Sequence, residues 1–290
     1  MYDIIIIGAG PAGMTAAIYA LRANKKVLIF EANTYGGQIV NAPKVENYPG
    51  IKEISGYDFA TNLYNQVKDL GGEFIFDAVI RIDGNKVITN NGNYETKKII
   101  LAIGAQNRKL NIPGEAEYAG KGVSYCATCD GNFFKGKTVA VVGGGNTALE
   151  DAIYLSDLAS KVYLIHRKDT FRGEAKYQDE INSKSNIELI MNTNVTKISG
   201  TDTVTNIELD NGNTLNIDGI FIAVGQQPNS MIFKNAVDID EFGYIKTNDG
   251  VHTNNENIYV AGDARKKDLK QIITAESDGA IAAVTAIKEM

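Results

Sequence analysis

The chain contains one local pattern twice, and this repetition limits the folds open to it. A short apolar run, a glycine-rich turn, a helix-forming stretch and a second apolar run follow one another over residues 3–31. The same order returns over residues 139–168. Each copy is typical of a strand, a tight turn, a helix and a strand. The sequence therefore predicts two βαβ units.

The repetition continues beyond these units. An alternating, turn-rich stretch follows each of them, at 74–98 and at 187–217, and each contains an Asn-Gly pair that signals a hairpin. Each stretch is followed by an apolar run that closes with glycine, at 99–104 and at 220–225. Repeated βαβ units carry phosphate-binding turns at their strand ends. We therefore expect an α/β chain of two Rossmann-like, three-layer (ββα) dinucleotide-binding domains.

The last part of the chain has no counterpart in the second copy. A short apolar run at 257–260 leads to an Ala-rich helix at about 274–290. We expect this tail to return to the first domain, so that the second domain is inserted in the first. The first dinucleotide-binding domain is then expected to comprise 1–115 with 244–290, and the inserted second one 116–243. The expected links lie near Pro113-Gly114 and Phe242-Gly243.

Composition excludes some classes of protein. The 290 residues are enough for two domains, and the formal net charge of -6 argues against a surface that binds nucleic acid. The N-terminal stretch lacks the basic region of a signal peptide, and its isoleucine run is too short to span a membrane. We therefore expect a cytoplasmic protein that binds neither nucleic acid nor membrane.

The first glycine turn has the full fingerprint of a dinucleotide site. Gly8 suits the tight turn, Gly10 allows the pyrophosphate to approach the backbone, and Gly13 allows close helix packing. Glu31 ends the next predicted strand, where an acid accepts hydrogen bonds from a ribose and repels a 2'-phosphate. This site suits FAD or NAD(H) rather than NADPH. The alternative is a packing turn with an ordinary surface glutamate.

The second glycine turn differs where the ligand is selected. Gly143, Gly145 and Ala148 occupy the three fingerprint positions. Basic residues replace the acid after the next strand, and cations there can pair with the 2'-phosphate of NADPH. The alternative is a solvated basic loop. The basic residues are His166, Arg167, Lys168 and Arg172.

The two cysteines, Cys126 and Cys129, have the spacing of a redox pair and precede the second fingerprint. Asp130 follows directly, and a carboxyl group there can transfer the proton that thiol–disulfide exchange requires. A zinc site is not expected, because His166 and His252 show no ligand spacing to the pair. The alternative is two core cysteines near each other by chance.

Taken together, these motifs resemble the low-molecular-weight, bacterial-type thioredoxin reductases over nearly the whole chain. Lys168 departs from the family pattern, in which a second arginine is usual, so NADPH preference is expected to be weaker. The matching motifs are residues 8–13, 36–38, 46–50, 126–131, 143–148, 166–167, 262–263 and 271–272.

The resemblance implies a homodimeric flavoenzyme that passes electrons from NADPH through FAD to thioredoxin. It implies that Cys129 faces the flavin, that Cys126 attacks the substrate disulfide, that Asp130 is the general acid, and that the nucleotide domain rotates. The expected FAD contacts are Gly8, Gly10, Pro11, Ala12, Gly13, Glu31, Ala32, Gly36, Gly37, Gln38, Asn47, Val79, Gly104, Gly262, Asp263, Lys270, Gln271 and Ile272. The expected NADPH contacts are Gly143, Gly145, Asn146, Thr147, Ala148, His166, Arg167, Lys168 and Arg172.

Two other functions stay open from the sequence. The same chemistry could serve another thiol–disulfide partner, such as a peroxiredoxin-reducing or glutaredoxin-like protein. The chain could also be a flavin-binding redox protein with a different electron donor, or a sensor with little turnover. The intact second fingerprint and its basic residues argue against ferredoxin as the donor.

Overall fold

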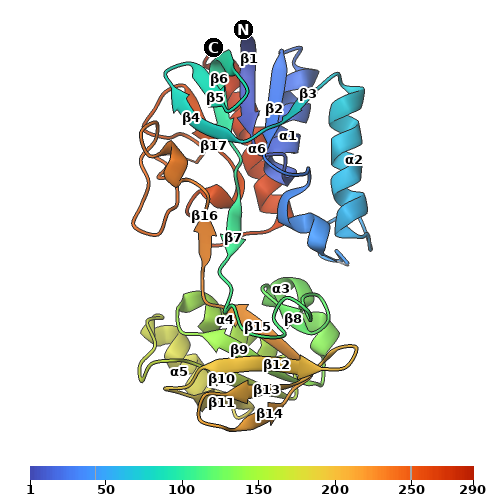
Figure 1. Cartoon of the computed structure of the whole chain (residues 1–290), viewed down its shortest axis with the longest axis vertical. Coiled ribbons are helices and arrows are strands. Elements are labelled where there is room, and N and C mark those ends of the chain that lie inside the picture. The colour runs from blue at the N-terminus through green and yellow to red at the C-terminus, as the bar shows by residue number, and fades with distance from the viewer. Residues whose placement is uncertain (43, 249) are drawn as a thin grey trace. The chain divides into compact units, whose positions relative to one another are not determined.

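The computed structural model describes residues 1–42, 44–248 and 250–290. The chain forms two compact units (Figure 1): unit 1 comprises residues 1–106 and 227–290, and unit 2 comprises residues 107–226. The chain passes between the units in β7 (Ala105–Asn107) and β16 (Gln226–Pro228), which pair with each other. Among the described residues, no helix is both long enough and apolar enough to cross a membrane.

Unit 1 is built on a seven-stranded sheet in the order β3-β2-β1-β6-β5-β4, with β17 also paired to β6. The strands around β1 are parallel, whereas β4, β5 and the start of β6 form an antiparallel meander. The strands are β1 (Tyr2–Ile7), β2 (Val27–Glu31), β3 (Glu73–Phe76), β4 (Val79–Asp83), β5 (Lys86–Thr89), β6 (Asn93–Leu101) and β17 (Ile258–Val260).

Both faces of the unit 1 sheet are covered, which explains the isoleucine run in β1. Ile4 and Ile6 point into a core with α1 and α6, while Ile5 and Ile7 point into a core with the β4–β5 hairpin. Figure 1 shows α1 and α6 lying against one face of the sheet. The helices are α1 (Pro11–Arg22), α2 (Gly56–Asp69) and α6 (Ile272–Lys288), with 3-10 turns η1 (Gly37–Asn41), η3 (Met231–Phe233) and η4 (Gly262–Ala264).

Unit 2 has a parallel five-stranded sheet in the order β11-β10-β9-β15-β8. Helices cover one face, and an antiparallel sheet, β12-β13-β14, covers the other. The sheet strands are β8 (Val123–Ser124), β9 (Thr138–Gly143), β10 (Lys161–Ile165), β11 (Ile187–Ile190) and β15 (Gly219–Ala223). The remaining elements are α3 (Ala127–Asp130), η2 (Gly131–Phe134), α4 (Asn146–Ser156), α5 (Ala175–Ser183), β12 (Val195–Gly200), β13 (Val204–Leu209) and β14 (Thr214–Asn216).

The predicted duplication is confirmed. Strands β2-β1-β6 of unit 1 and β10-β9-β15 of unit 2 have the same order, and each trio lies between helices and an antiparallel layer. The tail also returns as expected, because β17 pairs with β6 in unit 1. The fold is therefore α/β, with two three-layer ββα units and the second inserted in the first.

The unit boundaries differ from the expected ones at 115/116 and 243/244. Pro113 O accepts a hydrogen bond from Ile198 N at 3.0 Å, so the Pro113-Gly114 turn lies within unit 2. Residues such as Phe233 and Val237 lie in the core of unit 1. The chain therefore passes between the units at β7 and β16 rather than at the two Gly-containing turns.

Candidate functional site

The first glycine turn has the geometry that the fingerprint requires. Gly8 has φ +107°, and a Cβ there would lie 2.3 Å from Ala102 O. A Cβ at Gly13 would lie 1.9 Å from Gly8 O, so α1 approaches the turn as only glycine permits. Of the described atoms, none lies within 4 Å of a Cβ built at Gly10. The backbone at Gly10 is therefore open to a ligand.

Other expected residues gather around this turn. A Cβ at Gly37 would lie 3.4 Å from Gly10 Cα, and one at Gly262 would lie 3.0 Å from Ala12 Cβ. Glu31 Oε2 accepts a hydrogen bond from Ala9 N at 3.0 Å, and its Oε1 accepts one from Asn33 N at 3.0 Å. The structure thus brings η1, η4 and the end of β2, where Ala32 follows, to the start of α1.

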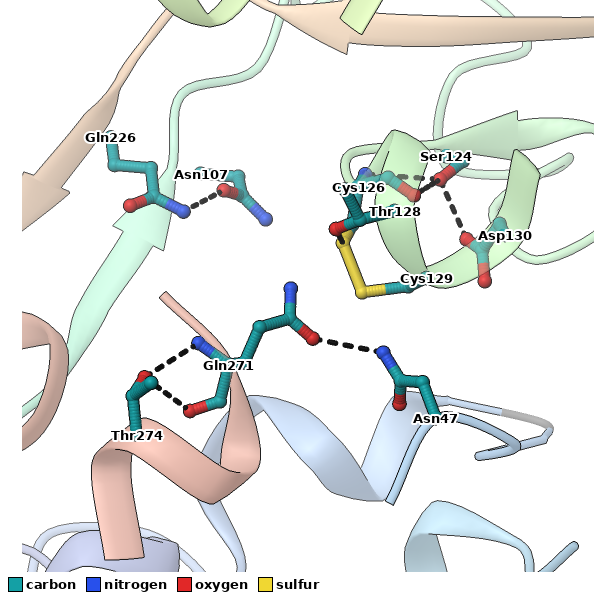
Figure 2. The surroundings of a disulfide bond; sticks show 10 residues. All are labelled: Asn47, Asn107, Ser124, Cys126, Thr128, Cys129, Asp130, Gln226, Gln271 and Thr274. Carbon is teal, nitrogen blue, oxygen red and sulfur yellow. Dashed lines mark hydrogen bonds between the residues drawn. A yellow bond between two sulfur atoms is a disulfide. The ribbon is translucent and has the colours of Figure 1, made fainter. Parts of the chain in front are cut away.

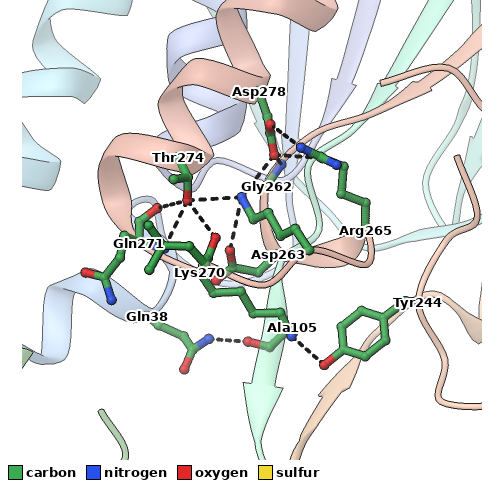
Figure 3. A network of polar contacts seen from close by, with 12 residues as sticks. Gln38, Ala105, Tyr244, Gly262, Asp263, Arg265, Lys270, Gln271, Thr274 and Asp278 are labelled. Carbon is green, nitrogen blue, oxygen red and sulfur yellow. Dashed lines mark hydrogen bonds and ion pairs between the residues drawn. The ribbon is translucent and has the colours of Figure 1, made fainter. Parts of the chain in front are cut away.

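Asp263 in η4 places a buried carboxylate oxygen in this region, where a polar ligand could bind it (Figure 3). Its Oδ1 is buried and has no hydrogen-bond partner among the described residues, while Lys267 Nζ lies 3.6 Å away. Burial raises the pKa of Asp263, although the charges of Lys267 and Lys270 oppose the shift. Buried carboxylate oxygens are normally hydrogen-bonded. The open backbone at Gly10 and this oxygen without a hydrogen-bond donor fit a nucleotide with a hydroxyl group to donate.

Asp278 of α6 holds η4 in place. Its carboxylate accepts hydrogen bonds from Gly262 N at 3.0 Å, from Arg265 Nε and Nη2 at 3.0 and 2.8 Å, and from Lys267 Nζ at 3.0 Å. Burial alone would raise the pKa of Asp278, but these two cations hold it below its ordinary value. The sequence patterns did not reveal this cluster, because its members lie on a loop and a helix that only the fold brings together.

The start of α6 gathers further expected residues. Gln271, the residue before Ile272, and Thr274 form a capping box at the first turn of α6, and Asn47 Nδ2 donates to Gln271 Oε1 at 2.9 Å. Tyr48 OH donates to the buried carboxyl of Glu276 at 2.5 Å, and burial of the two groups raises the pKa of each.

The remaining expected residues of unit 1 differ in their accessibility. Gln38 Nε2 donates to Ala105 O, and Lys270 Nζ donates to Tyr244 OH at 2.5 Å. Gly104, with φ +61°, is open like Gly10. The side chain of Val79 is buried in the core with the β4–β5 hairpin, so only its backbone could meet a ligand.

The second glycine turn repeats the geometry of the first. A Cβ at Gly143 would lie 2.4 Å from Ala223 O and 2.6 Å from Ala148 Cβ. Of the described atoms, none lies within 4 Å of a Cβ at Gly145. Gly143 and Gly145 therefore match Gly8 and Gly10 in role, and Asn146 and Thr147 begin α4 just after them.

The basic loop after β10 is fastened to this turn. Gly144 O accepts hydrogen bonds from Arg172 N at 2.7 Å and Gly173 N at 3.2 Å. Asn146 and Glu174 exchange two hydrogen bonds of 2.8 Å. The side chains of Arg167, Lys168 and Arg172 are exposed. Three cations thus lie on a loop that hydrogen bonds to Gly144 and Asn146 hold beside the glycine turn.

His166 is placed differently from the other basic residues. It is 6% exposed, its ring lies against Gly144 and stacks on Phe171, and Nε2 lies 3.2 Å from Thr170 O. Burial lowers the pKa of His166, and the neighbouring cations add to the effect. Its buried ring therefore packs against Gly144 of the glycine turn and does not add to the exposed charge of the loop.

Cys126 and Cys129 form a disulfide across α3, with Cα atoms 5.3 Å apart (Figure 2). The alternative of two unconnected core cysteines is therefore wrong. Ser124 Oγ accepts a hydrogen bond from Cys126 N at 3.1 Å and donates to Asp130 Oδ2 at 2.6 Å. Burial raises the pKa of Asp130, although the Ser124 hydrogen bond opposes the shift. The disulfide thus has a partly buried carboxyl group, able to carry a proton, fixed beside it.

The comparisons with known proteins agree with this arrangement. The chain is 42% identical to a thioredoxin reductase of Bacillus subtilis, over 98% of this chain and 93% of the relative. It is 40% identical to a thioredoxin reductase of Listeria monocytogenes, over 99% and 93%. A crystal structure of thioredoxin reductase from Streptococcus pyogenes superposes with a TM-score of 0.94 at 41% identity, covering 100% of this chain and 98% of that one. Residues 2–279 match the pyridine nucleotide-disulphide oxidoreductase family, and the chain belongs to that family.

Proposed function

We propose that the chain is a thioredoxin reductase that uses NADPH as the electron donor and FAD as the carrier. The observation that carries this proposal is the Cys126–Cys129 disulfide beside Asp130, in the unit that also holds the glycine turn with the basic loop. Curated relatives named thioredoxin reductase, at 40–42% identity over nearly the whole chain, support it.

We assign FAD to unit 1 and NADPH to unit 2. The open backbone at Gly10 suits a pyrophosphate, and Asp263 Oδ1 suits a hydroxyl donor. In unit 2, Gly145 offers the equivalent backbone, and Arg167, Lys168 and Arg172 supply charge for a 2'-phosphate. The flavin held in unit 1 would supply the redox chemistry that links NADPH oxidation to opening of the Cys126–Cys129 disulfide.

The cysteines then carry out two exchanges. The Cys126 thiolate attacks one sulfur of the thioredoxin disulfide, which forms a mixed disulfide and releases one thioredoxin thiolate. Cys129 attacks Cys126 Sγ, which releases the second thioredoxin thiolate and restores the Cys126–Cys129 disulfide. Asp130 holds a proton for a departing thiolate, since its raised pKa favours the protonated carboxyl. The sum is NADPH, a proton and oxidised thioredoxin giving NADP⁺ and reduced thioredoxin.

We also propose that the protein is a cytoplasmic homodimer. Dithiol chemistry with NADPH suits a reducing compartment. Tyr19 of α1 and Ile281 and Val284 of α6 are exposed, and the two helices pack side by side in unit 1. Apolar side chains in this position suit a self-complementary interface. Light scattering on the purified protein tests this, and Ile281→Glu is expected to shift a dimer toward the monomer.

The main test is an anaerobic titration that follows the flavin absorbance with NADPH and, separately, with NADH. Rapid bleaching by NADPH with little by NADH supports the proposal, and no bleaching by either nucleotide contradicts it. A Cys129→Ser variant is expected to retain oxidised thioredoxin as a mixed disulfide through Cys126. The matched Cys126→Ser variant should not retain it. Retention of a different thiol–disulfide protein in place of thioredoxin would support the alternative partner.

A further inference from the structure

Glu115 is a buried charge that lies outside the machinery described so far. Glu115 is 2% exposed, and its carboxylate accepts three hydrogen bonds. Leu110 N donates to Oε1 at 3.1 Å, Asn111 N donates to Oε2 at 2.6 Å, and Tyr125 OH donates to Oε1 at 2.8 Å. A buried carboxylate with this many donors is fixed in place.

The first two donors belong to the segment by which the chain enters unit 2. Residues 108–112 follow β7, and Asn111 has φ +59°, a left-handed conformation that asparagine tolerates. The next residues are fastened to the antiparallel layer, where Pro113 O accepts from Ile198 N at 3.0 Å and Tyr118 OH donates to Gly200 O at 2.9 Å. Glu115 is therefore held on a rigid support.

The third donor belongs to the segment that carries the disulfide. Tyr125 directly precedes Cys126, and Ser124 before it holds both Cys126 N and Asp130. Burial raises the pKa of Tyr125, and its hydrogen bond to Glu115 adds to the shift, so the hydroxyl keeps its proton. Two consecutive side chains thus fix the backbone before Cys126, and Tyr125 ties its last residue directly to the Glu115 carboxylate.

We propose that Glu115 and Tyr125 form a strut that positions Cys126 for reaction with Cys129. When the disulfide opens, the two sulfurs are free to separate, and the strut holds Cys126 near the place that it has in the disulfide. A pair of thiols held close forms a disulfide more readily, because less freedom is lost on closure. Both residues are positioning residues, since neither touches the sulfur atoms in this role. The inference rests on the proposed function only for the redox activity of the pair.

The test compares Tyr125→Phe with Tyr118→Phe in the holoenzyme. Each change deletes one tyrosine hydroxyl and one hydrogen bond within unit 2, but only the first touches the strut. The proteins are equilibrated anaerobically with mixtures of reduced and oxidised dithiothreitol, and free thiols are alkylated and counted by mass. Tyr125→Phe is expected to lower the equilibrium constant for disulfide formation about tenfold, which raises the midpoint potential by about 30 mV. Tyr118→Phe loosens the support but keeps the bond between Tyr125 and Glu115, so it is expected to shift this equilibrium constant far less.

A double variant tests whether the two residues act as a unit. In the Tyr125→Phe background, Glu115→Gln is expected to add no further shift in potential, because the strut is already broken. The inference is overturned if Tyr125→Phe keeps the wild-type potential, if Tyr118→Phe shifts it equally, or if the two strut substitutions are fully additive.

The dithiothreitol equilibrium needs no thioredoxin, so it separates this inference from the proposed function. A wild-type protein that fails to reduce thioredoxin contradicts the proposed function, while the potentials still decide on the strut. Turnover adds a second readout: Tyr125→Phe should lower kcat/KM for thioredoxin and leave NADPH–ferricyanide activity, which needs no dithiol, unchanged. Equal loss of both activities would count against the strut.

Discussion

Ser124 Oγ lies 2.6 Å from Asp130 Oδ2 and 3.1 Å from Cys126 N, so one hydroxyl links the acid to the first cysteine. The Asp130 carboxyl is partly buried, and burial raises its pKa even though this hydrogen bond favours the charged form. Perturbed pKa values cluster at functional sites. Asp130 can therefore be protonated when a thiolate departs and charged again before the next turnover.

We predict that Asp130→Asn lowers thioredoxin-reducing kcat about 100-fold, the usual contribution of a positioned acid. Asparagine keeps the shape and can still accept the Ser124 hydrogen bond, but it cannot supply a proton. Stopped-flow measurement with NADPH checks the step, because flavin reduction should stay fast while thioredoxin reduction slows. Ser124→Ala is expected to have a smaller effect and to move the pH dependence of turnover upward, since the charged carboxylate loses a donor. Equal slowing of both half-reactions by Asp130→Asn would contradict this role.

Local signals explain which parts of the structure were predictable from the sequence. The isoleucine run of β1 and the glycines at 8, 10 and 13 encode a buried strand and a phosphate turn within a few residues, and these elements are as predicted. Pro113-Gly114 has the composition of a link, yet it packs on Ile198, so composition alone misplaced the boundary.

The polar clusters were not predictable for a different reason. The bond between Glu115 and Tyr125, and that between Lys267 and Asp278, join residues about ten positions apart whose meeting depends on how loops turn back. No periodicity or motif marks such pairs. His166 shows a different case: its basic character predicted an NADPH contact, and no sequence pattern indicated that its ring would be buried against Gly144.

Asp151 on α4 gives a pH-dependent prediction. Burial, with a smaller contribution from the charge of Glu150, raises its pKa from 3.8 to about 7. Because the folded state favours the protonated carboxyl, the charged form destabilises the protein, and this cost grows as pH rises from about 4 to 7. Asp151→Asn removes the cost. The variant is expected to melt at a higher temperature than wild type at pH 8, and the difference should shrink toward pH 5.

Thermal scans at several pH values check this, with Asp157→Asn as the control. Asp157 is an exposed carboxylate at the end of the same helix, where it pairs with Lys184. Its substitution is expected to change Tm by an amount that does not vary between pH 5 and pH 8. A difference for Asp151→Asn that is constant with pH would exclude the raised pKa.

The basic loop predicts the choice of nucleotide. A charge-assisted hydrogen bond contributes about 1.5–3 kcal/mol, so Arg172→Ala is expected to raise KM for NADPH about 10- to 100-fold and leave KM for NADH nearly unchanged. Lys168→Arg is expected to strengthen NADPH preference, because a guanidinium group can bind phosphate through two donors. Lys176→Ala is the control, since it removes an equal charge from a nearby residue that pairs with Glu174. An equal rise in both KM values would point to a structural role for Arg172.

Asp278 provides the prediction for unit 1. It is 4% exposed and binds Arg265 and Lys267, so Asp278→Asn removes the carboxylate charge that both cations contact. Removing one partner of a buried ion pair costs about 3–5 kcal/mol. Because its pKa is lowered, the stabilisation by Asp278 is complete above the ordinary value of 3.8 and is lost as pH falls below it.

We expect Asp278→Asn to unfold at a lower urea concentration at pH 7 and to lose FAD on desalting, because Asp278 also holds Gly262 beside Asp263. Asp268→Asn, in an exposed position of the same loop, is the control and should keep the wild-type urea stability and the bound FAD. If Asp278→Asn behaves like this control, the cluster does not support the flavin site.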